Sequence, residues 1–279
     1  MQKTENPDFT LTKKLGRFAL RFARTPFGPP KRKFCFVHVP KCGGNSVAIA
    51  FINRIPLMQD STWVPVVETR RALSVAYLGH MDENKFHDDG PNCAKVYELR
   101  RQIATMGMDL GHYFVGGHFL FDSASYEIFS DEYAWVTILR DPVSRLISHY
   151  REEVRSGFID FSLEDYLDTY TAKMHATMIT RYMAGWLDNS LAPDEIAKNL
   201  ALQNLKKFSA IGFLDDLAPF KERVSNISGK SFSLGHSRAG IAIKPDVSDQ
   251  TLARIRKLCQ SDSEVYEHAR ALRLETLSQ

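Results

Sequence analysis

Residues that could hold an anion follow a short apolar run, in the sequence PKCGGNS at positions 40–46. Gly43 and Gly44 would let the backbone approach an anion closely, and free N–H groups at the start of a helix would point at it. Lys41 adds a positive charge, and Asn45 and Ser46 follow at the helix start, where Ser46 also offers a hydroxyl group. The segment predicts a loop that binds a phosphate or sulfate group. It lacks the Gly-x-x-x-x-Gly-Lys-Ser/Thr signature, so we expect a nucleotide held differently from ATP in a P-loop kinase.

A second candidate anion site lies in the sequence LRDPVSRLISHY at positions 139–150. Asp141 is a good helix N-cap, and Pro142 suits the first helical position. The planar guanidinium of Arg140 could hold a phosphate, and the hydroxyl of Ser148 could donate to the same group. Taken alone, the segment is better explained by a surface ion pair between Asp141 and Arg145, with Ser148 an ordinary polar residue. Beside the first loop, it favours a ligand with two anionic groups.

Strands that alternate with helices must position these residues. The predicted strands are Lys33–Val39, Tyr113–Val115, Tyr133–Leu139 and Ala210–Leu214. The predicted helices are Asn45–Ile55, Val96–Met106, 142–155, Leu163–Tyr170, His175–Trp186, Pro193–Lys207, Leu217–Ile227 and Ser248–Leu274, and Thr62–Asn92 is predicted as loop with some helix. This order predicts an α/β fold with three layers, P-loop-like, in which helices flank a central parallel sheet. Ligands bind such folds at the carboxyl ends of the strands, where the loops at Lys41, His118 and Arg140 would lie.

The composition sets the broad class of protein. The 279 residues can bury a full core, and 44% apolar with 25% charged residues is ordinary for a soluble globular chain. A formal charge of +3 is too small to argue for nucleic acid, and we expect no such partner. The four cysteines form no C-x-x-C pair, which predicts reduced thiols of a cytosolic protein. No cluster of acidic and histidine residues suggests a metal, so none is expected.

Residues 1–30 are predicted to form a segment separate from the main domain at residues 31–279. Residues 9–24 alternate apolar and basic side chains, as in a basic amphipathic helix, and TPFGPP at positions 25–30 would end it. Such a helix could lie on an anionic membrane surface, although packing on the domain with its cations in water is more common. No apolar run reaches the roughly 18 residues that span a bilayer. We therefore expect a cytoplasmic protein, with peripheral membrane contact as an alternative.

The sequence resembles a known family at several motifs. HVPKCGGNSV at positions 38–47 resembles the 5′-phosphosulfate loop of sulfotransferases, and RDPVSRLISHY at 140–150 resembles their 3′-phosphate motif. The similarity is greatest to Golgi carbohydrate O-sulfotransferases of the heparan-sulfate 2-O type and their bacterial counterparts. Weaker matches are GGHF at 116–119, TRYMAG at 180–185, NLKKFSAIGFLDDL at 204–217 and DSEVYEHA at 262–269. The resemblance covers roughly Phe34–Leu274, nearly the whole chain.

The resemblance implies a donor, 3′-phosphoadenosine 5′-phosphosulfate, whose sulfonate passes to a hydroxyl or amine acceptor. Lys41 would stabilise the bridging oxygen and the leaving phosphate, while Gly43, Gly44, Asn45 and Ser46 would hold the 5′ group. Arg140 and Ser148 would hold the 3′-phosphate, and Arg181 would meet donor or acceptor anions, with a helix-surface ion pair as an equal alternative. Two anion loops on one chain agree with a donor that carries anions at both ends of its adenosine.

The general base is predicted less directly. His118 is the best candidate, because histidine titrates near neutral pH and this one lies in a loop at the expected active edge. The 2-O family has His-Gly-His where this chain has Gly116-Gly117-His118, so the histidine usually named as the base is missing here. His112 or Asp122 could act instead.

Two other function classes remain open from the sequence. A P-loop-like nucleotide kinase would need a P-loop serine or threonine and a metal-binding carboxylate after a strand, and neither is evident. A non-catalytic nucleotide-binding module would fit the missing histidine but not the retained Lys41. The acceptor, a glycan, glycolipid or other small hydroxyl compound, and the oligomeric state are not encoded in any motif.

Overall fold

The computed structural model describes residues 31–55, 60–88, 90–185, 195–234 and 247–277. The predicted amphipathic segment at residues 9–24 and the predicted domain boundary after residue 30 lie outside these residues. The described strands form one five-stranded parallel sheet in the order β2-β3-β1-β4-β5. The strands are β1 (Lys33–Val37), β2 (Ser61–Val64), β3 (Phe114–Gly117), β4 (Tyr133–Leu139) and β5 (Ala210–Phe213). The predicted α/β fold with a central parallel sheet flanked by helices is confirmed.

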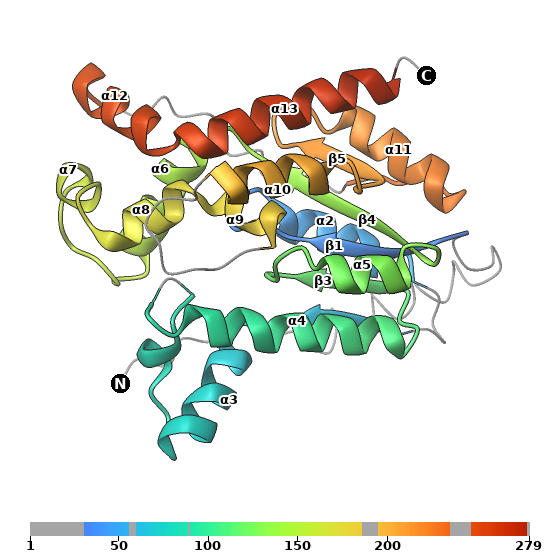
Figure 1. The fold of residues 1–279 in the computed structure, drawn as a ribbon, viewed down its shortest axis with the longest axis horizontal. Helices are drawn as coiled ribbons and strands as arrows, with labels where there is room; N and C mark the ends of the chain where they lie inside the picture. The colour runs from blue at the N-terminus through green and yellow to red at the C-terminus, as the bar shows by residue number, and fades with distance from the viewer. Residues whose placement is uncertain (1–30, 56–59, 89, 186–194, 235–246, 278–279) are drawn as a thin grey trace.

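Helices connect and cover these strands (Figure 1). They are α2 (Gly44–Ile52), α3 (Val66–Leu78), the 3-10 helix η2 (Glu83–Phe86), α4 (Cys93–Asp109), α5 (Ser123–Phe129), α6 (Pro142–Arg155), α7 (Leu163–Tyr166), α8 (Tyr170–Ala176), α9 (Met178–Ala184), α10 (Glu195–Leu205), α11 (Ala218–Ser228), α12 (Asp249–Leu258) and α13 (Gln260–Leu277). In Figure 1, α4 lies beside the β2 edge of the sheet, and α13 lies beyond β5 at the opposite edge.

The structure corrects three sequence predictions. The segment predicted as loop with some helix contains an edge strand, β2, and a full helix, α3. The two helices predicted at Leu163–Tyr170 and His175–Trp186 are instead three short ones, α7, α8 and α9. The last two meet at Thr177, whose φ of −116° departs from helical geometry. The helix predicted at Ser248–Leu274 is likewise divided at Cys259 into α12 and α13.

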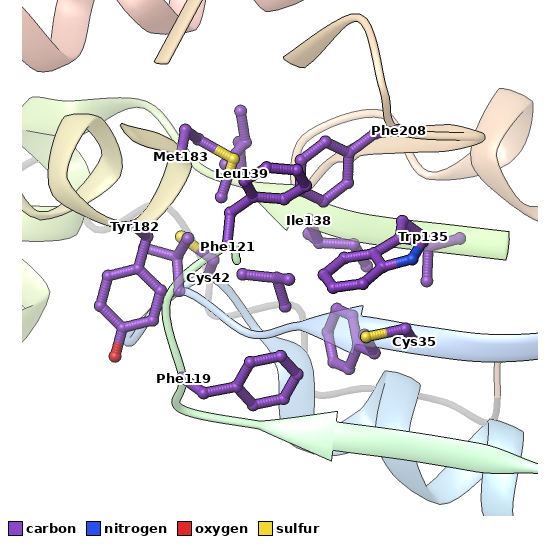
Figure 2. Packing of buried hydrophobic residues seen from close by; sticks show 14 of the residues in the cluster. Cys35, Cys42, Phe119, Phe121, Trp135, Ile138, Leu139, Tyr182, Met183 and Phe208 are labelled. Atoms are coloured by element: carbon purple, nitrogen blue, oxygen red, sulfur yellow. The ribbon is translucent and has the colours of Figure 1, made fainter. Parts of the chain in front are cut away.

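The main core lies along the sheet and holds most of the large buried side chains. β4 is buried along all seven residues, as expected for a strand with neighbours on both sides and helices on both faces. Trp135 and Phe121 pack edge to face, with ring centroids 5.3 Å apart. Figure 2 shows this part of the core, in which Cys42 from the first anion loop packs among Phe121, Leu139 and Tyr182.

A second core holds four helices together beyond the carboxyl ends of the strands. It consists of the buried residues Leu146, Ile147, Tyr166, Leu167, Ala172, Ala176, Ile255 and Cys259. These residues come from α6, α7, α8 and α12, which we call the helical lobe and which gather at the left of Figure 1. One of these helices, α6, begins directly after β4 and carries the predicted second anion motif.

Candidate active site

The first anion loop lies between β1 and α2, at the centre of the sheet. β1 pairs with β3 on one side and with β4 on the other, so the loops after all three strands meet at one edge. The strand order reverses direction at β1, which is the position where open α/β sheets bind ligands. The structure therefore brings the loops at Lys41, His118 and Arg140 to the same edge, as the sequence predicted.

The start of α2 offers backbone N–H groups to a ligand. Its N-cap is Gly43, with a φ of 77°, and no side chain caps the helix. A Cβ atom on Gly44 would lie 2.1 Å from the ring of His38, so only glycine fits there. Asn45 is exposed and Ser46 is half-buried in the first turn. The uncapped N–H groups and the helix dipole are the features that an anion-binding turn would use, so the predicted role of this loop stays a prediction that the geometry allows.

Lys41 occupies an unusual backbone conformation within this loop. Its φ is 65°, in the left-handed region, and no other described non-glycine residue has a positive φ. Such conformations cost about 1–3 kcal/mol and cluster at functional sites. The next residue, Cys42, is fully buried, and burial raises the pKa of its thiol to about 12, so the thiol stays protonated. Cys42 thus anchors the loop in the core while Lys41 points outward.

The side chain of Lys41 reaches across to α6. Its Nζ lies 3.3 Å from Oε2 of Glu152, which also pairs with Arg155 one turn further along the helix. Lys41 and Glu152 are both partly exposed, so the pair contributes little to stability. The contact shows instead that the Lys41 ammonium lies within reach of the face of α6 that carries the second anion motif.

The second anion motif begins directly after β4. Asp141 caps α6 by accepting a hydrogen bond of 2.8 Å from the backbone N–H of Ser144, and Pro142 occupies the first turn. Because Asp141 already fills this helix start, an anion here would rely on side chains. Arg140 is half-buried, and its Nη1 donates to the carbonyl oxygen of Lys41 at 3.4 Å. The two motifs predicted to bind separate anions are therefore in direct contact.

Ser144, Ser148 and Glu152 follow one another at intervals of one turn on α6. Ser148 is half-buried, and its hydroxyl has no hydrogen-bond partner among the described residues. Its position between the Arg140 end of the helix and the Lys41–Glu152 pair is compatible with the predicted contact to a 3′-phosphate.

Arg145 is not the surface residue that one interpretation of the sequence expected. Its side chain is fully buried, its Nη2 donates to the carbonyl of His175, and it pairs with Asp262 at 3.7 Å. Asp262 also accepts hydrogen bonds from the backbone N–H of Ile179 at 2.9 Å and of Thr180 at 2.8 Å. This fully buried network joins α6, α9 and α13, and so it fixes the helix that carries Ser148.

Arg181 lies next to this network on α9. Only 3% of the residue is exposed, and its Nε donates to Thr177 Oγ1 at 2.9 Å. Arg181 therefore does not lie on the helix surface, as the alternative of a helix-surface ion pair supposed. Contact between Arg181 and an anion stays a prediction, and it would require the side chain to become accessible.

His118 lies at the end of β3, and a second histidine that the sequence did not single out packs against it. The imidazole of His38 stacks on that of His118 with ring centroids 4.3 Å apart, and Nδ1 of His118 lies 2.8 Å from the carbonyl oxygen of His38. A carbonyl can only accept, so His118 carries its proton on Nδ1 and presents Nε2 as a base. Burial lowers the pKa of His118 to about 4, against the opposing effects of Asp88 and the His38 carbonyl.

A buried arginine fixes the backbone on the other side of His118. Arg100 on α4 is fully buried, and its Nη1 and Nη2 donate to the two oxygens of Asp88 at 2.8 and 2.7 Å. The same Nη1 lies 3.5 Å from the carbonyl oxygen of His118. Arg100 and Arg70 lower the pKa of Asp88 to about 2, although burial acts in the opposite direction. The carboxylate therefore stays charged and keeps Arg100 in place.

The other two candidates for a general base lie elsewhere. His112 precedes β3, and its Nδ1 lies 2.6 Å from Thr62 Oγ1, so it sits at the amino end of the strand, about 13 Å from the active edge. Asp122 caps α5 by accepting from the backbone N–H of Ser125 at 2.9 Å. Of the three candidates, His118 alone follows directly after a strand at the active edge.

Two residues at this edge escaped the sequence interpretation, for different reasons. His38 lies at the end of an apolar run, so the sequence indicates only a buried residue at the end of a strand. Its position one residue after β1 was the signal that could have identified it. Glu152 lies one turn after Ser148, so the spacing of Ser144, Ser148 and Glu152 on one helix face could have identified it.

The described residues contain no metal-binding cluster, disulfide bond or membrane-spanning helix. No group of three or more histidine, cysteine, aspartate or glutamate side chains there is placed to hold a metal ion. All four cysteines are buried and free of disulfide bonds. Within the described ranges, every helix is too short or too polar to cross a membrane.

Comparisons with known proteins complete the description. No protein-family model matches the chain, and no curated protein matches it either. Among solved structures, the chain is similar to the crystal structure of a sulfotransferase from Alicyclobacillus acidocaldarius. The similarity covers 82% of this chain and 96% of that chain, with 17% sequence identity and a TM-score of 0.40.

Proposed function

We propose that this protein is a sulfotransferase that moves the sulfonate group of 3′-phosphoadenosine 5′-phosphosulfate to an acceptor hydroxyl. The observation that carries the proposal is the contact between the two anion motifs, in which Arg140 Nη1 lies 3.4 Å from the Lys41 carbonyl. One motif offers backbone N–H groups and an ammonium, and the other offers a guanidinium and a hydroxyl. A single adenosine compound with anions at both ends would use both sets of groups.

The proposed reaction is an in-line displacement at sulfur. The acceptor oxygen forms a bond to sulfur while the bond from sulfur to the bridging phosphate oxygen breaks, and 3′-phosphoadenosine 5′-phosphate leaves. Charge builds on the bridging oxygen, where the Lys41 ammonium and the N–H groups of Gly44 and Asn45 would stabilise it. For this, the Lys41 ammonium must leave its ion pair with Glu152 and contact the donor instead. Nε2 of His118 would take the acceptor proton.

Ligand binding tests the proposal directly. In a calorimetric titration, we expect 3′-phosphoadenosine 5′-phosphate to bind more tightly than ATP. Ser148→Ala should weaken binding of 3′-phosphoadenosine 5′-phosphate by about 10-fold or more, because a hydrogen bond to a charged group is lost. Ser144→Ala, one turn earlier on the same helix, is the matched control and should bind normally. Tighter binding of ATP, or equal effects of the two substitutions, would contradict the proposal.

The pH dependence tests the role of His118. Its base form is neutral, and its pKa of about 4 keeps it neutral at pH 7. We expect kcat/KM to rise with pH through about 4 and to be flat above pH 5. A histidine with an unshifted pKa would place this rise, the acidic limb of the profile, at about pH 6.5. His118→Ala should lower kcat by about 10²-fold or more and remove this limb. If the acidic limb persists in the variant, His118 is excluded as the general base. Tryptophan fluorescence over the same pH range checks that the protein stays folded.

A further inference from the structure

The imidazole of His38 packs against two parts of the proposed reaction centre. The residue follows β1 directly, and its backbone N–H donates to the carbonyl oxygen of Gly117 at 3.0 Å, which extends the pairing with β3 by one residue. One face of the ring stacks on His118, with ring centroids 4.3 Å apart. The Nε2–Cδ2 edge of the ring lies 2.1 Å from the position that a Cβ atom of Gly44 would take. His38 therefore contacts both the predicted base and the first turn of α2.

The two ring nitrogens of His38 have different surroundings. Nδ1 is buried and has no hydrogen-bond partner. Nε2 bonds to no described residue either, but it is not buried, so a ligand can reach it. A buried polar atom without a partner costs free energy that an apolar side chain in the same place would not. Packing alone therefore does not explain an imidazole at this position.

The His38 ring is neutral and carries its one proton on Nε2. Burial, and after it the charge of His118, hold the pKa of His38 well below its usual range. A neutral imidazole has one N–H donor and one acceptor nitrogen. A proton on Nδ1 would be a buried donor without an acceptor, which native proteins rarely contain. A proton on Nε2 instead gives a donor on the edge of the ring that faces Gly44.

The first turn of α2 gathers other donors beside this Nε2–H group. No side chain caps α2, so Nε2 of His38 does not accept a hydrogen bond from the helix. The first N–H groups of a helix have no partner within it, and Lys41 adds an ammonium to the same loop. Residues 38–48 include no aspartate or glutamate, and Glu152, which pairs with Lys41, belongs to α6. Such a set of donors suits a sulfonate or phosphate oxygen and not a cation.

We propose that His38 is a further binding residue of the first anion loop, and that its Nε2–H donates to an oxygen of a sulfonate or phosphate group held at the start of α2. The identity of this group as the 5′ end of 3′-phosphoadenosine 5′-phosphosulfate rests on the proposed function. The stacked His118 has the opposite tautomer, with its proton on Nδ1 and a free Nε2. One ring of the pair thus binds the donor, and the other takes the acceptor proton.

NMR on the full chain, labelled with 15N, tests the protonation and the contact without any substitution. At pH 7 we expect His38 to be neutral with its proton on Nε2, and His118 to carry its proton on Nδ1. Titration with inorganic sulfate should shift the Nε2 resonance of His38 together with the backbone N–H of Gly44. His112, at the opposite end of β3, is the control and should not shift. A proton on Nδ1 of His38, or no shift of its Nε2 with sulfate, overturns the inference.

Two substitutions test the donor itself. His38→Met and His38→Gln both remove the stacked ring, but only glutamine keeps an N–H group at the ε position. By calorimetry, His38→Met should weaken binding of 3′-phosphoadenosine 5′-phosphate by about 10-fold or more, and His38→Gln by no more than about 3-fold. Adenosine 3′-phosphate, which lacks the 5′ group, should bind both variants as it binds the unaltered protein. Equal losses in the two variants, or an equal loss for adenosine 3′-phosphate, would mean that His38 only supports the fold.

The outcomes separate this inference from the proposed function. If neither nucleotide binds the unaltered protein but sulfate shifts the Nε2 resonance of His38, the sulfotransferase assignment fails and the anion contact of His38 stands. If 3′-phosphoadenosine 5′-phosphate binds and His38→Met leaves its affinity unchanged, the role of His38 is overturned and the sulfotransferase assignment stands.

Discussion

Lys41→Ala is expected to lower kcat by about 10²–10³-fold, because the variant loses the charge that we propose stabilises the bridging oxygen in the transition state. The affinity for 3′-phosphoadenosine 5′-phosphate should fall much less than kcat, because the backbone N–H groups of α2 remain. Single-turnover transfer of labelled sulfonate to an acceptor, together with calorimetry, measures the two effects separately.

The folding stability of this variant should change little. Lys41 is partly exposed, and its ion pair with Glu152 is a surface contact worth about 0–1 kcal/mol. Lys41→Gly adds a second check, because glycine tolerates the φ of 65° at this position, so it should be as inactive as alanine and at least as stable. Arg155→Ala removes the other cation near Glu152 and should keep near-normal turnover. Near-normal turnover of Lys41→Ala would rule out the catalytic role.

Asp262→Ala is expected to lower the free energy of unfolding by about 3–5 kcal/mol, because it leaves the buried Arg145 without a compensating charge. It also removes the acceptor for the backbone N–H groups of Ile179 and Thr180. Urea unfolding followed by fluorescence measures the loss. Asp109→Ala, at an exposed aspartate on α4, should change the free energy by no more than about 0.5 kcal/mol.

A double variant shows whether the uncompensated charge is the cause. Arg145→Met with Asp262→Leu removes both buried charges, and apolar replacement of a buried pair is often tolerated. We expect the double variant to be more stable than Asp262→Ala alone. If the double variant were the less stable of the two, an uncompensated charge on Arg145 would not explain the loss, because both variants lack the acceptor for the N–H groups of α9.

The elements next to the anion motifs were the most predictable from sequence. β4 and α6 have the bounds that the sequence predicted, because an apolar run leads into an arginine, an N-cap aspartate and a proline. β2 was missed because it is a four-residue edge strand directly before a proline, too short for a periodic signal. The division at Cys259 was missed because neither glycine nor proline marks it, and apolar spacing continues through it.

Contacts between distant segments could not be predicted in the same way. Arg145 and Asp262 lie on separate helices, and nothing in either segment shows that they meet inside the protein. The stacking of His38 on His118 depends on the register that pairs Val37 with Gly117. By contrast, the meeting of the loops at Lys41 and Arg140 follows from strand order alone, since parallel strands end at one edge.

The position of β2 at the edge of the sheet has an evolutionary consequence. Among the described strands it pairs with β3 alone, and the segment that follows it forms α3 and η2, which pack on α4. Insertions or exchanges between β2 and α4 would therefore remodel this edge of the molecule while the pairing of β1 with β3 and β4 at the centre of the sheet is kept. Paralogues built on this scaffold should diverge fastest in that stretch.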